Sequence, residues 1–193
     1  MSLDAEIIQV FVMYYNKILN ILPLIIYPDE NLEKEEEILR PIKFHPIWFL
    51  DFNEQNDFEH IDITYNGKVY CARKYKIITK RRNIKQEFND DNLDTIVIII
   101  VLPKVLDIYG LNFLSVVSEA ILSENIDSFY KIIESEIFKK NVIQTPTIKN
   151  LIKSGDSLKM EINGILKNIW DDYFQKVVTH YQHLNLLYSS VHT

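Results

Sequence analysis

Two histidines three residues apart are the first candidates for chemistry in this chain. His180 and His183 would share one face of a helix, where imidazoles can bind zinc if carboxylates such as Asp171 or Asp172 approach. The sequence specifies no third ligand for such a site. We therefore interpret both histidines as surface or partly packed residues, and we predict neither a metal site nor a cofactor.

A second group of polar residues lies between positions 45 and 60. His45 and His60 flank Asp51 and Asp57, and such side chains can act as general acids or bases in a ligand pocket. His45 stands between a phenylalanine and a proline, which favours a structural role. A small enzyme or ligand-binding domain with a pocket near His45, Asp51 and His60 is an alternative hypothesis.

The remaining catalytic patterns are weak or absent. Cys71 could be a nucleophile if a base lowered the pKa of its thiol, but its place in the strand-like VYCAR predicts a buried, inert side chain. Glu134 and Glu136 do not face each other on a helix, and neither do Asp171 and Asp172. The sequence contains no GxxxxGK[ST], GxGxxG, GxSxG or HExxH motif. We predict no catalytic residue.

Basic residues gather between positions 73 and 85 of an otherwise acidic chain. They could bind an anionic membrane surface or an acidic face of a partner. They could also form a solvated loop that the acidic stretch Glu87 to Asp94 partly neutralises. The candidate docking residues are Arg73, Lys74, Lys80, Arg81, Arg82 and Lys85.

The composition describes a folded chain that is poorly suited to nucleic acid. Its 193 residues are 47% hydrophobic, and the formal net charge of -6 provides no global positive field for phosphates. A single cysteine excludes an intramolecular disulfide and suits a reducing cytoplasm. No uncharged apolar run reaches the roughly 18 to 20 residues of a membrane span. We expect a cytoplasmic protein, with contact at a membrane surface as an extension of that expectation.

Five strands are predicted, and they come in the first 102 residues. Glu6 to Tyr15 is apolar on both alternating faces, which predicts a central strand, and Leu22 to Tyr27 follows it as a hairpin partner. Ile61 to Ile78 forms a second hairpin around Asn66-Gly67, a pair suited to a type I′ turn. Thr95 to Leu102 is continuously apolar, as in a strand that is covered on both faces.

The rest of the chain is predicted to be mostly helical. Asp29 to Leu39 could form a short acidic helix, whereas the two prolines of Arg40 to Leu50 predict an extended segment on the core. Helical spacing dominates after Gly110, with a register shift near Ser123 to Asn125. Further boundaries are an N-cap at Thr145, a stop at Gly155 and a last helix from Ser157.

The last predicted helix carries a broad apolar stripe that must be buried on some surface. It could pack on the chain's own sheet, pair with a partner helix or lie on lipid. The aromatic residues of this possible partner face are Trp170, Tyr173, Phe174 and Tyr181.

The order of elements resembles the longin fold and the related roadblock domains. The resemblance rests on the opening IIQVFVMYY and LPLIIYPDE, on IDITYNGKVYCARKY and on TIVIIIVLP, and it covers about residues 1–141. It implies an α+β fold in which a five-stranded, mostly antiparallel sheet (strand, strand, helix, three strands) is packed by long helices. Residues 142–193 would then form a helical extension packed on that domain. The acidic Asp29 to Leu39 is shorter than the family's first helix.

The resemblance also implies a class of function. Longin and roadblock domains are generally non-enzymatic platforms that bind small GTPases, SNARE helices or each other, often at membranes. We therefore expect a scaffold that recruits or regulates a small GTPase or trafficking component, and it could act as a homodimer or heterodimer built through sheet edges or helices. A structural subunit that completes a larger complex through its last helix is a further alternative.

Overall fold

The computed structural model describes residues 8–16, 20–29, 31, 34, 36–44, 60–78, 93–123, 125–140 and 145–191. The described strands and helices are, in chain order, β1 (Gln9–Asn16), β2 (Asn20–Tyr27), α1 (Glu36–Phe44), β3 (Ile61–Tyr65), β4 (Lys68–Ile78), β5 (Leu93–Pro103), the 3-10 helix η2 (Lys104–Tyr109), α3 (Gly110–Leu122), the 3-10 turn η3 (Ile126–Ser128), α4 (Tyr130–Phe138), α5 (Pro146–Ile169), the π-helical turn η4 (Trp170–Phe174) and α6 (Gln175–Val191).

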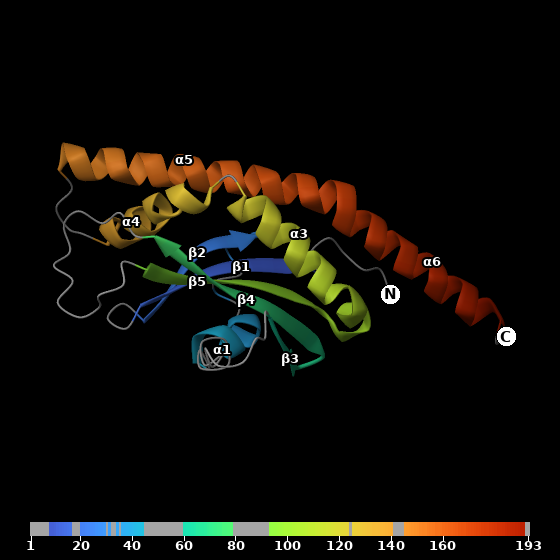
Figure 1. The fold of residues 1–193 in the computed structure, drawn as a ribbon. Coiled ribbons are helices and arrows are strands. Elements are labelled where there is room, and N and C mark those ends of the chain that lie inside the picture. Colours follow the sequence, from blue (N-terminus) through green and yellow to red (C-terminus); the bar gives the residue numbers. More distant parts are fainter. Residues whose placement is uncertain are drawn as a thin grey trace.

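The five strands form one antiparallel sheet in the order β2-β1-β5-β4-β3 (Figure 1). The predicted α+β class and five-stranded antiparallel sheet are therefore confirmed. β1 pairs with β2 on one side and with β5 on the other, as its apolar residues on both faces predicted. The continuously apolar β5 occupies the middle of the sheet.

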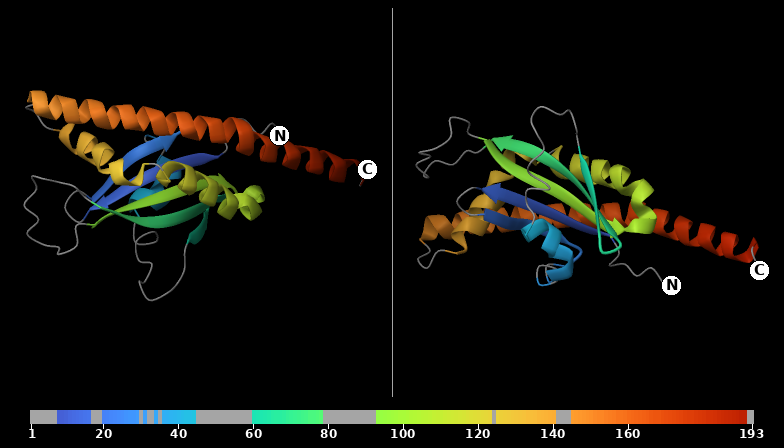
Figure 2. Two further views of the ribbon diagram at one scale, coloured as in Figure 1. Left: turned by 45° about the horizontal axis from the view of Figure 1, so that its top comes forward. Right: turned by 90° about the horizontal axis from the view of Figure 1, so that it is seen from below.

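Alternate residues of β1 enter two separate cores. Val10, Val12 and Tyr14 belong to a large cluster that includes the buried faces of α3, α4 and α5. Phe11 and Met13 belong to a smaller cluster with residues of α1. The helices thus lie on opposite faces of the sheet, with α3, α4 and α5 on one side and α1 on the other (Figure 2).

The β3-β4 hairpin turns at the predicted dipeptide. Asn66 and Gly67 both have positive φ, 47° and 72°, as a type I′ turn requires. The turn is fixed to the far end of β5, because the backbone N–H of Lys104 donates to the carbonyl oxygen of Gly67 at 2.9 Å. This hydrogen bond holds the hairpin tip against η2.

Helix α1 corrects the interpretation of the proline-containing segment. Arg40 to Phe44 is helical and not extended, with Pro41 inside the helix, while residues 45–50 lie outside the described residues. Pro41 cannot donate to the carbonyl four residues earlier, which costs one helical hydrogen bond. The helix persists because Ile38, Leu39 and Ile42 are buried against the sheet. It begins at Glu36, seven residues after the predicted start.

The C-terminal helix also differs from the prediction. Gly155 was expected to end a helix, but α5 runs through it from Pro146 to Ile169 and continues through η4 into α6. A Cβ at Gly155 would lie less than 3.0 Å from Ser135 of α4 and from the carbonyl oxygen of Lys131. This glycine therefore permits a close helix crossing and does not stop the chain. The predicted N-cap is confirmed, since Thr145 Oγ1 accepts from the N–H of Ile148.

The stretch Lys104–Leu122 is long and apolar enough to cross a membrane when judged by length and composition alone. Core helices of soluble proteins pass the same test. In this fold Leu106, Phe113 and Val117 of that stretch are fully buried in the core cluster beside the sheet. We interpret the stretch as a core helix.

Candidate functional site

The basic residues predicted as a docking patch are only partly described. Arg73 and Lys74 lie on β4 and are half-buried, whereas Lys80, Arg81, Arg82 and Lys85 lie outside the described residues. Neighbouring strand residues point to opposite faces, so Arg73 is on the face of α3 and Lys74 on the face of α1. The structure does not bring these two residues together on one face.

The histidine-containing candidates do not assemble a site among the described residues. His60 lies 3.8 Å from Asp62, while His45, Asp51 and Asp57 lie outside those residues, so the pocket hypothesis stays a prediction. His180 and His183 border a hollow of about 470 Å³ along one exposed face of the last helix. Within the described ranges, no group of three or more His, Cys, Asp or Glu side chains could hold a metal ion.

Cys71 lies in the core, as predicted. Its side chain is 1% exposed, and burial raises the pKa of the thiol, with a further contribution from Asp62 on the neighbouring strand. A thiol with a raised pKa stays protonated at neutral pH and is a poor nucleophile. The buried position therefore suits packing better than catalysis.

The aromatic stripe of the last helix faces the protein's own core. Phe174 is 1% exposed, and its ring centroid lies 4.4 Å from that of Phe113 on α3. Tyr173 meets Phe113 edge-on at 5.7 Å, and Trp170 meets Phe174 in the same way at 5.7 Å. Trp170, Tyr173 and Tyr181 are only partly buried. A partner could reach the outer edges of these three rings but not Phe174.

Apolar side chains are exposed at the junction of η2 and α3. Val105 is 55% exposed, Ile108 80% and Leu111 41%. Val105 and Ile108 lie three residues apart on the 3-10 helix η2, which has three residues per turn, so their side chains are on the same side. Leu111 follows after three more residues, in the first turn of α3. We call these three residues the apolar corner. The only other large hydrophobic side chain so exposed among the described residues is Met160, on α5.

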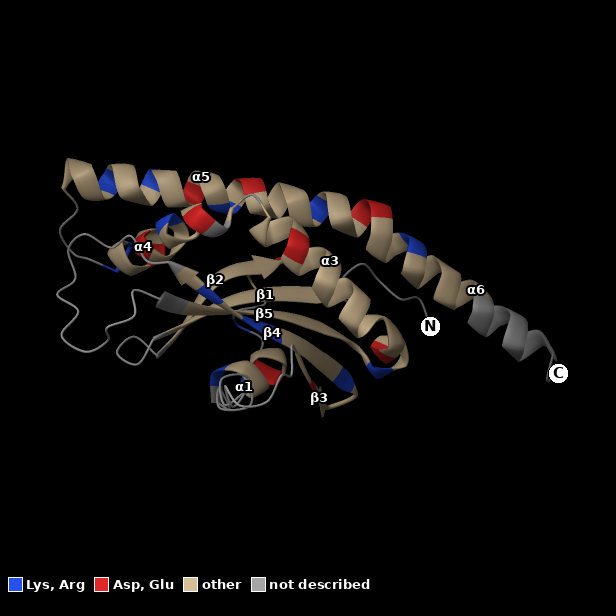
Figure 3. Cartoon of the chain, in the orientation of Figure 1, with Lys and Arg blue, Asp and Glu red and all other residues tan. Residues whose placement is uncertain are grey.

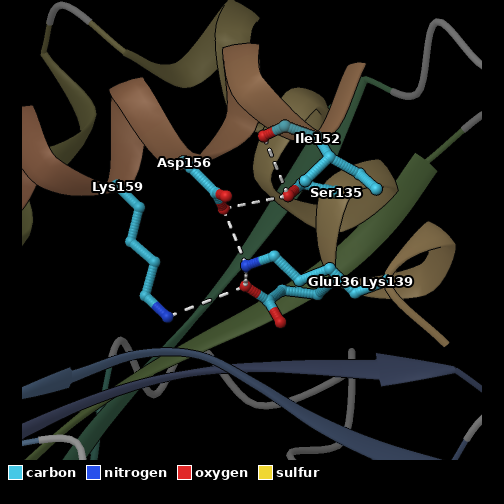
Figure 4. Close-up of polar contacts among 6 residues, drawn as sticks. All are labelled: Ser135, Glu136, Lys139, Ile152, Asp156 and Lys159. Carbon is cyan, nitrogen blue, oxygen red and sulfur yellow. Dashed lines mark hydrogen bonds and ion pairs between the residues drawn. The ribbon is translucent and has the colours of Figure 1, made fainter. Parts of the chain in front are cut away.

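A polar cluster joins α4 to α5 where the two helices cross (Figure 4). The buried hydroxyl of Ser135 lies 3.2 Å from Asp156 Oδ1 and 3.3 Å from the carbonyl oxygen of Ile152, and it can donate to one of them at a time. Lys139 Nζ lies 2.7 Å from Asp156 and 2.8 Å from Glu136. The arrangement locks the two helices together.

The charges in this cluster strengthen one another. Burial by itself lowers the pKa of Lys139, but the hydrogen bonds and the charges of Asp156 and Glu136 outweigh that effect and raise it. Lys159 Nζ also lies 3.7 Å from Glu136. Glu136 is therefore shared between two ammonium groups.

Next to this cluster lies a hollow of about 570 Å³ at the β2 edge of the sheet. One wall carries Lys43 of α1, and the opposite wall carries residues of α4 and α5. We call this hollow the lysine groove. Its lining residues are Ile21, Leu22, Pro23, Leu24, Ile26, Lys43, Glu136, Lys139, Lys140 and Lys159. In Figure 4 the ends of the Lys139, Glu136 and Lys159 side chains lie between their helices and the blue strands.

The sequence did not indicate the lysine groove. Figure 3 shows why, because basic and acidic residues are interspersed along α4 and α5 as on an ordinary solvated helix. The only local signal is the pair Lys139-Lys140. Lys43 and Lys159 join it through tertiary structure, which brings α1 and α5 to the same edge of the sheet. The apolar corner left a clearer signal, since Val105, Ile108 and Leu111 recur every three residues.

Comparison with known proteins adds no identity to this chain. No model of a known protein family matches the sequence, and no curated protein matches it.

Proposed function

We propose that this protein is a non-catalytic interaction module of the longin type, which recruits or regulates a small GTPase or a membrane-trafficking component in the cytoplasm. The element order supports the proposal, because two strands, a helix, three strands and then helices follow one another as the resemblance implies. This support is a likeness of architecture, and function depends on the surface that a fold presents. Pairing with a second copy or with another longin or roadblock domain belongs to the same proposal.

The apolar corner is the observation that carries the proposal. Exposed apolar side chains that cluster on one side of a helix are typical of protein contacts. The corner also has a firm base, since Leu106 and Phe113 are fully buried beneath it and Lys104 pairs with Asp107. A partner would therefore meet a preformed surface and would lose little free energy to ordering it.

Affinity capture with three forms of the protein tests this proposal. Wild type, Ile108→Asp and Met160→Asp are used to capture proteins from a lysate of cells that express the chain, and mass spectrometry identifies what binds. Met160 is 74% exposed, close to the 80% of Ile108, but it lies outside the apolar corner, so its substitution controls for the added charge. We expect a small GTPase or trafficking component with wild type and Met160→Asp and its loss with Ile108→Asp. Failure to capture any protein of those classes would contradict the proposed function.

A structural subunit remains a second candidate, because α6 continues beyond the edge of the sheet (Figures 1 and 2). A helix that extends past its own domain can complete a larger assembly. Native mass measurement of the complex isolated from cells separates the two candidates. A stoichiometric assembly without any GTPase or trafficking component favours the structural subunit, whereas a monomer or dimer opposes it.

A further inference from the structure

We infer that the lysine groove binds an acidic segment of a partner protein in extended conformation, which adds as a sixth strand to the outer edge of β2. The groove shares no residue with the apolar corner. This inference therefore goes beyond the proposed function, and either can fail without the other.

The first observation is the position of β2 in the sheet. β2 stands at the end of the strand order, so none of the other described strands pairs with its outer edge. Four consecutive residues of this strand, Ile21 to Leu24, line the groove together with Ile26. An edge strand presents backbone N–H and C=O groups that can pair with another extended chain. Pro23 has no N–H and can offer only its carbonyl group.

The second observation is the pair of walls that flank this edge. Lys43 lies on the α1 side of the sheet, whereas Lys139, Lys140 and Lys159 lie on the side of α4 and α5. Successive side chains of an added strand would point to opposite faces of the sheet. Every second side chain of the bound segment would therefore approach the wall that carries three lysines.

The third observation is the local charge. Four lysines and one glutamate line the groove in a chain whose formal net charge is -6. Lys139 is paired with Glu136 and also with Asp156 beside the groove, and Lys159 lies near Glu136, so the four lysines stand against two carboxylates. The groove is thus a basic site on an acidic protein, and it would attract acidic segments and repel basic ones.

The lining also favours a peptide over a nucleic acid. No aromatic side chain is present among the lining residues to stack on a base, and the net charge of the whole chain opposes a polyanion. The floor consists of apolar β2 side chains, of which Ile21 and Pro23 are half-buried and accessible. Apolar residues between the acidic ones would therefore find contacts in the same groove.

The test uses a fluorescein-labelled peptide of eight residues, alternating glutamate and valine, which matches the length of β2. Fluorescence anisotropy with wild-type protein should show saturable binding that weakens as salt is added. Lys140→Glu should weaken binding about tenfold, since it replaces an attractive charge with a repulsive one. Lys43→Glu tests the opposite wall. Lys167→Glu is the matched control, because Lys167 is exposed on α5 outside the groove and should leave binding unchanged.

A backbone test distinguishes strand addition from a purely electrostatic contact. Two versions of the peptide carry N-methyl groups on either the odd or the even residues, and each removes the N–H donors from one edge. One version should lose binding and the other should retain it, because only one edge of the peptide pairs with β2. Ile108→Asp should bind the peptide as wild type does.

Four results would overturn the inference. These are the absence of saturable binding, equal affinity for wild type and Lys140→Glu, equal affinity for both methylated peptides, and tighter binding of an alternating lysine-valine peptide or of a DNA oligonucleotide. Thermal unfolding of each variant confirms that a loss of binding does not reflect a loss of fold.

Discussion

The two faces of the sheet receive alternate side chains from the same strands, yet helices cover them to very different extents. On one face α3, α4, α5 and η4 enclose the larger core, in which Phe113 and Phe174 are almost fully buried. On the other face α1 is the only described helix, and it has nine residues with a proline among them. Strand residues are nevertheless buried on both faces. An apolar pattern on both faces of a strand therefore predicts that both faces are buried. It does not predict which helices cover each face.

The largest expected effect comes from the helix-rich face. Phe113→Ala removes a fully buried ring that contacts Tyr173 and Phe174, and we expect it to lower the free energy of unfolding by about 3–5 kcal/mol. Ile42→Ala removes a fully buried side chain from α1 and should cost about 2 kcal/mol, because a short helix can settle into the space. Urea unfolding measures the free energy of unfolding of both variants and of wild type. Equal losses would show that the two cores contribute alike.

Two glycines on α5 test how tightly α5 packs against α4 on the same face. Gly155→Ala would force a Cβ against Ser135 and the Lys131 carbonyl oxygen, and we expect it to cost about 1–3 kcal/mol. A Cβ at Gly164 would meet no atom within 4 Å, so Gly164→Ala should stabilise the helix by about 1 kcal/mol. Thermal unfolding of the two variants gives the comparison. Stabilisation by both substitutions would disprove the tight crossing of α4 and α5.

The smallest change concerns the link between the sheet and α1. The hydroxyl of Tyr70 on β4 donates to the carbonyl oxygen of Ile38 at 3.0 Å, in a buried position. Tyr70→Phe removes this hydrogen bond and should cost about 1 kcal/mol. Hydrogen exchange should show faster opening of α1 than of α3 in this variant. Unchanged exchange in α1 would mean that the hydrogen bond does not hold the helix.

The same tyrosine predicts a dependence on alkaline pH. Burial, with a smaller contribution from Tyr65, raises the pKa of Tyr70 from 10.0 to about 12. The folded state therefore favours the neutral phenol, and this contribution to stability is complete below pH 10 and is lost as the pH rises towards 12. Stability measured by urea unfolding should fall over that interval, and it should fall less in Tyr70→Phe. Burial also raises the pKa of Tyr15, so some decline should persist.

The parts of the fold that the sequence predicted are those in which local pattern and tertiary packing agree. The apolar patterns of β1 and β5 predicted two strands that the structure confirms. The Asn66-Gly67 pair predicted the turn between β3 and β4, which is confirmed as well. The errors came where packing outweighed a local preference. Burial of Ile38, Leu39 and Ile42 keeps α1 helical through Pro41, and the approach of Ser135 explains Gly155.

The candidate sites were harder to predict for a different reason. The lysine groove gathers Lys43, Lys139, Lys140 and Lys159 from separate parts of the chain, and each residue alone resembles an ordinary surface lysine. The apolar corner is continuous in sequence, but its neighbours Leu106 and Phe113 share the same hydrophobic character and are buried. Only the three-dimensional structure separates the exposed positions from the buried ones.

The capture experiment identifies a GTPase or trafficking protein as a partner. Direct binding of that purified partner then tests whether the apolar corner is its docking site. Isothermal titration of the purified partner, with any GTPase loaded with GDP or with a non-hydrolysable GTP analogue, is carried out against wild type, Ile108→Asp and Met160→Asp. We expect saturable binding by wild type and Met160→Asp and its loss with Ile108→Asp, while all three proteins unfold at similar temperatures. Equal affinity for Ile108→Asp and wild type, or no binding to either, would contradict it.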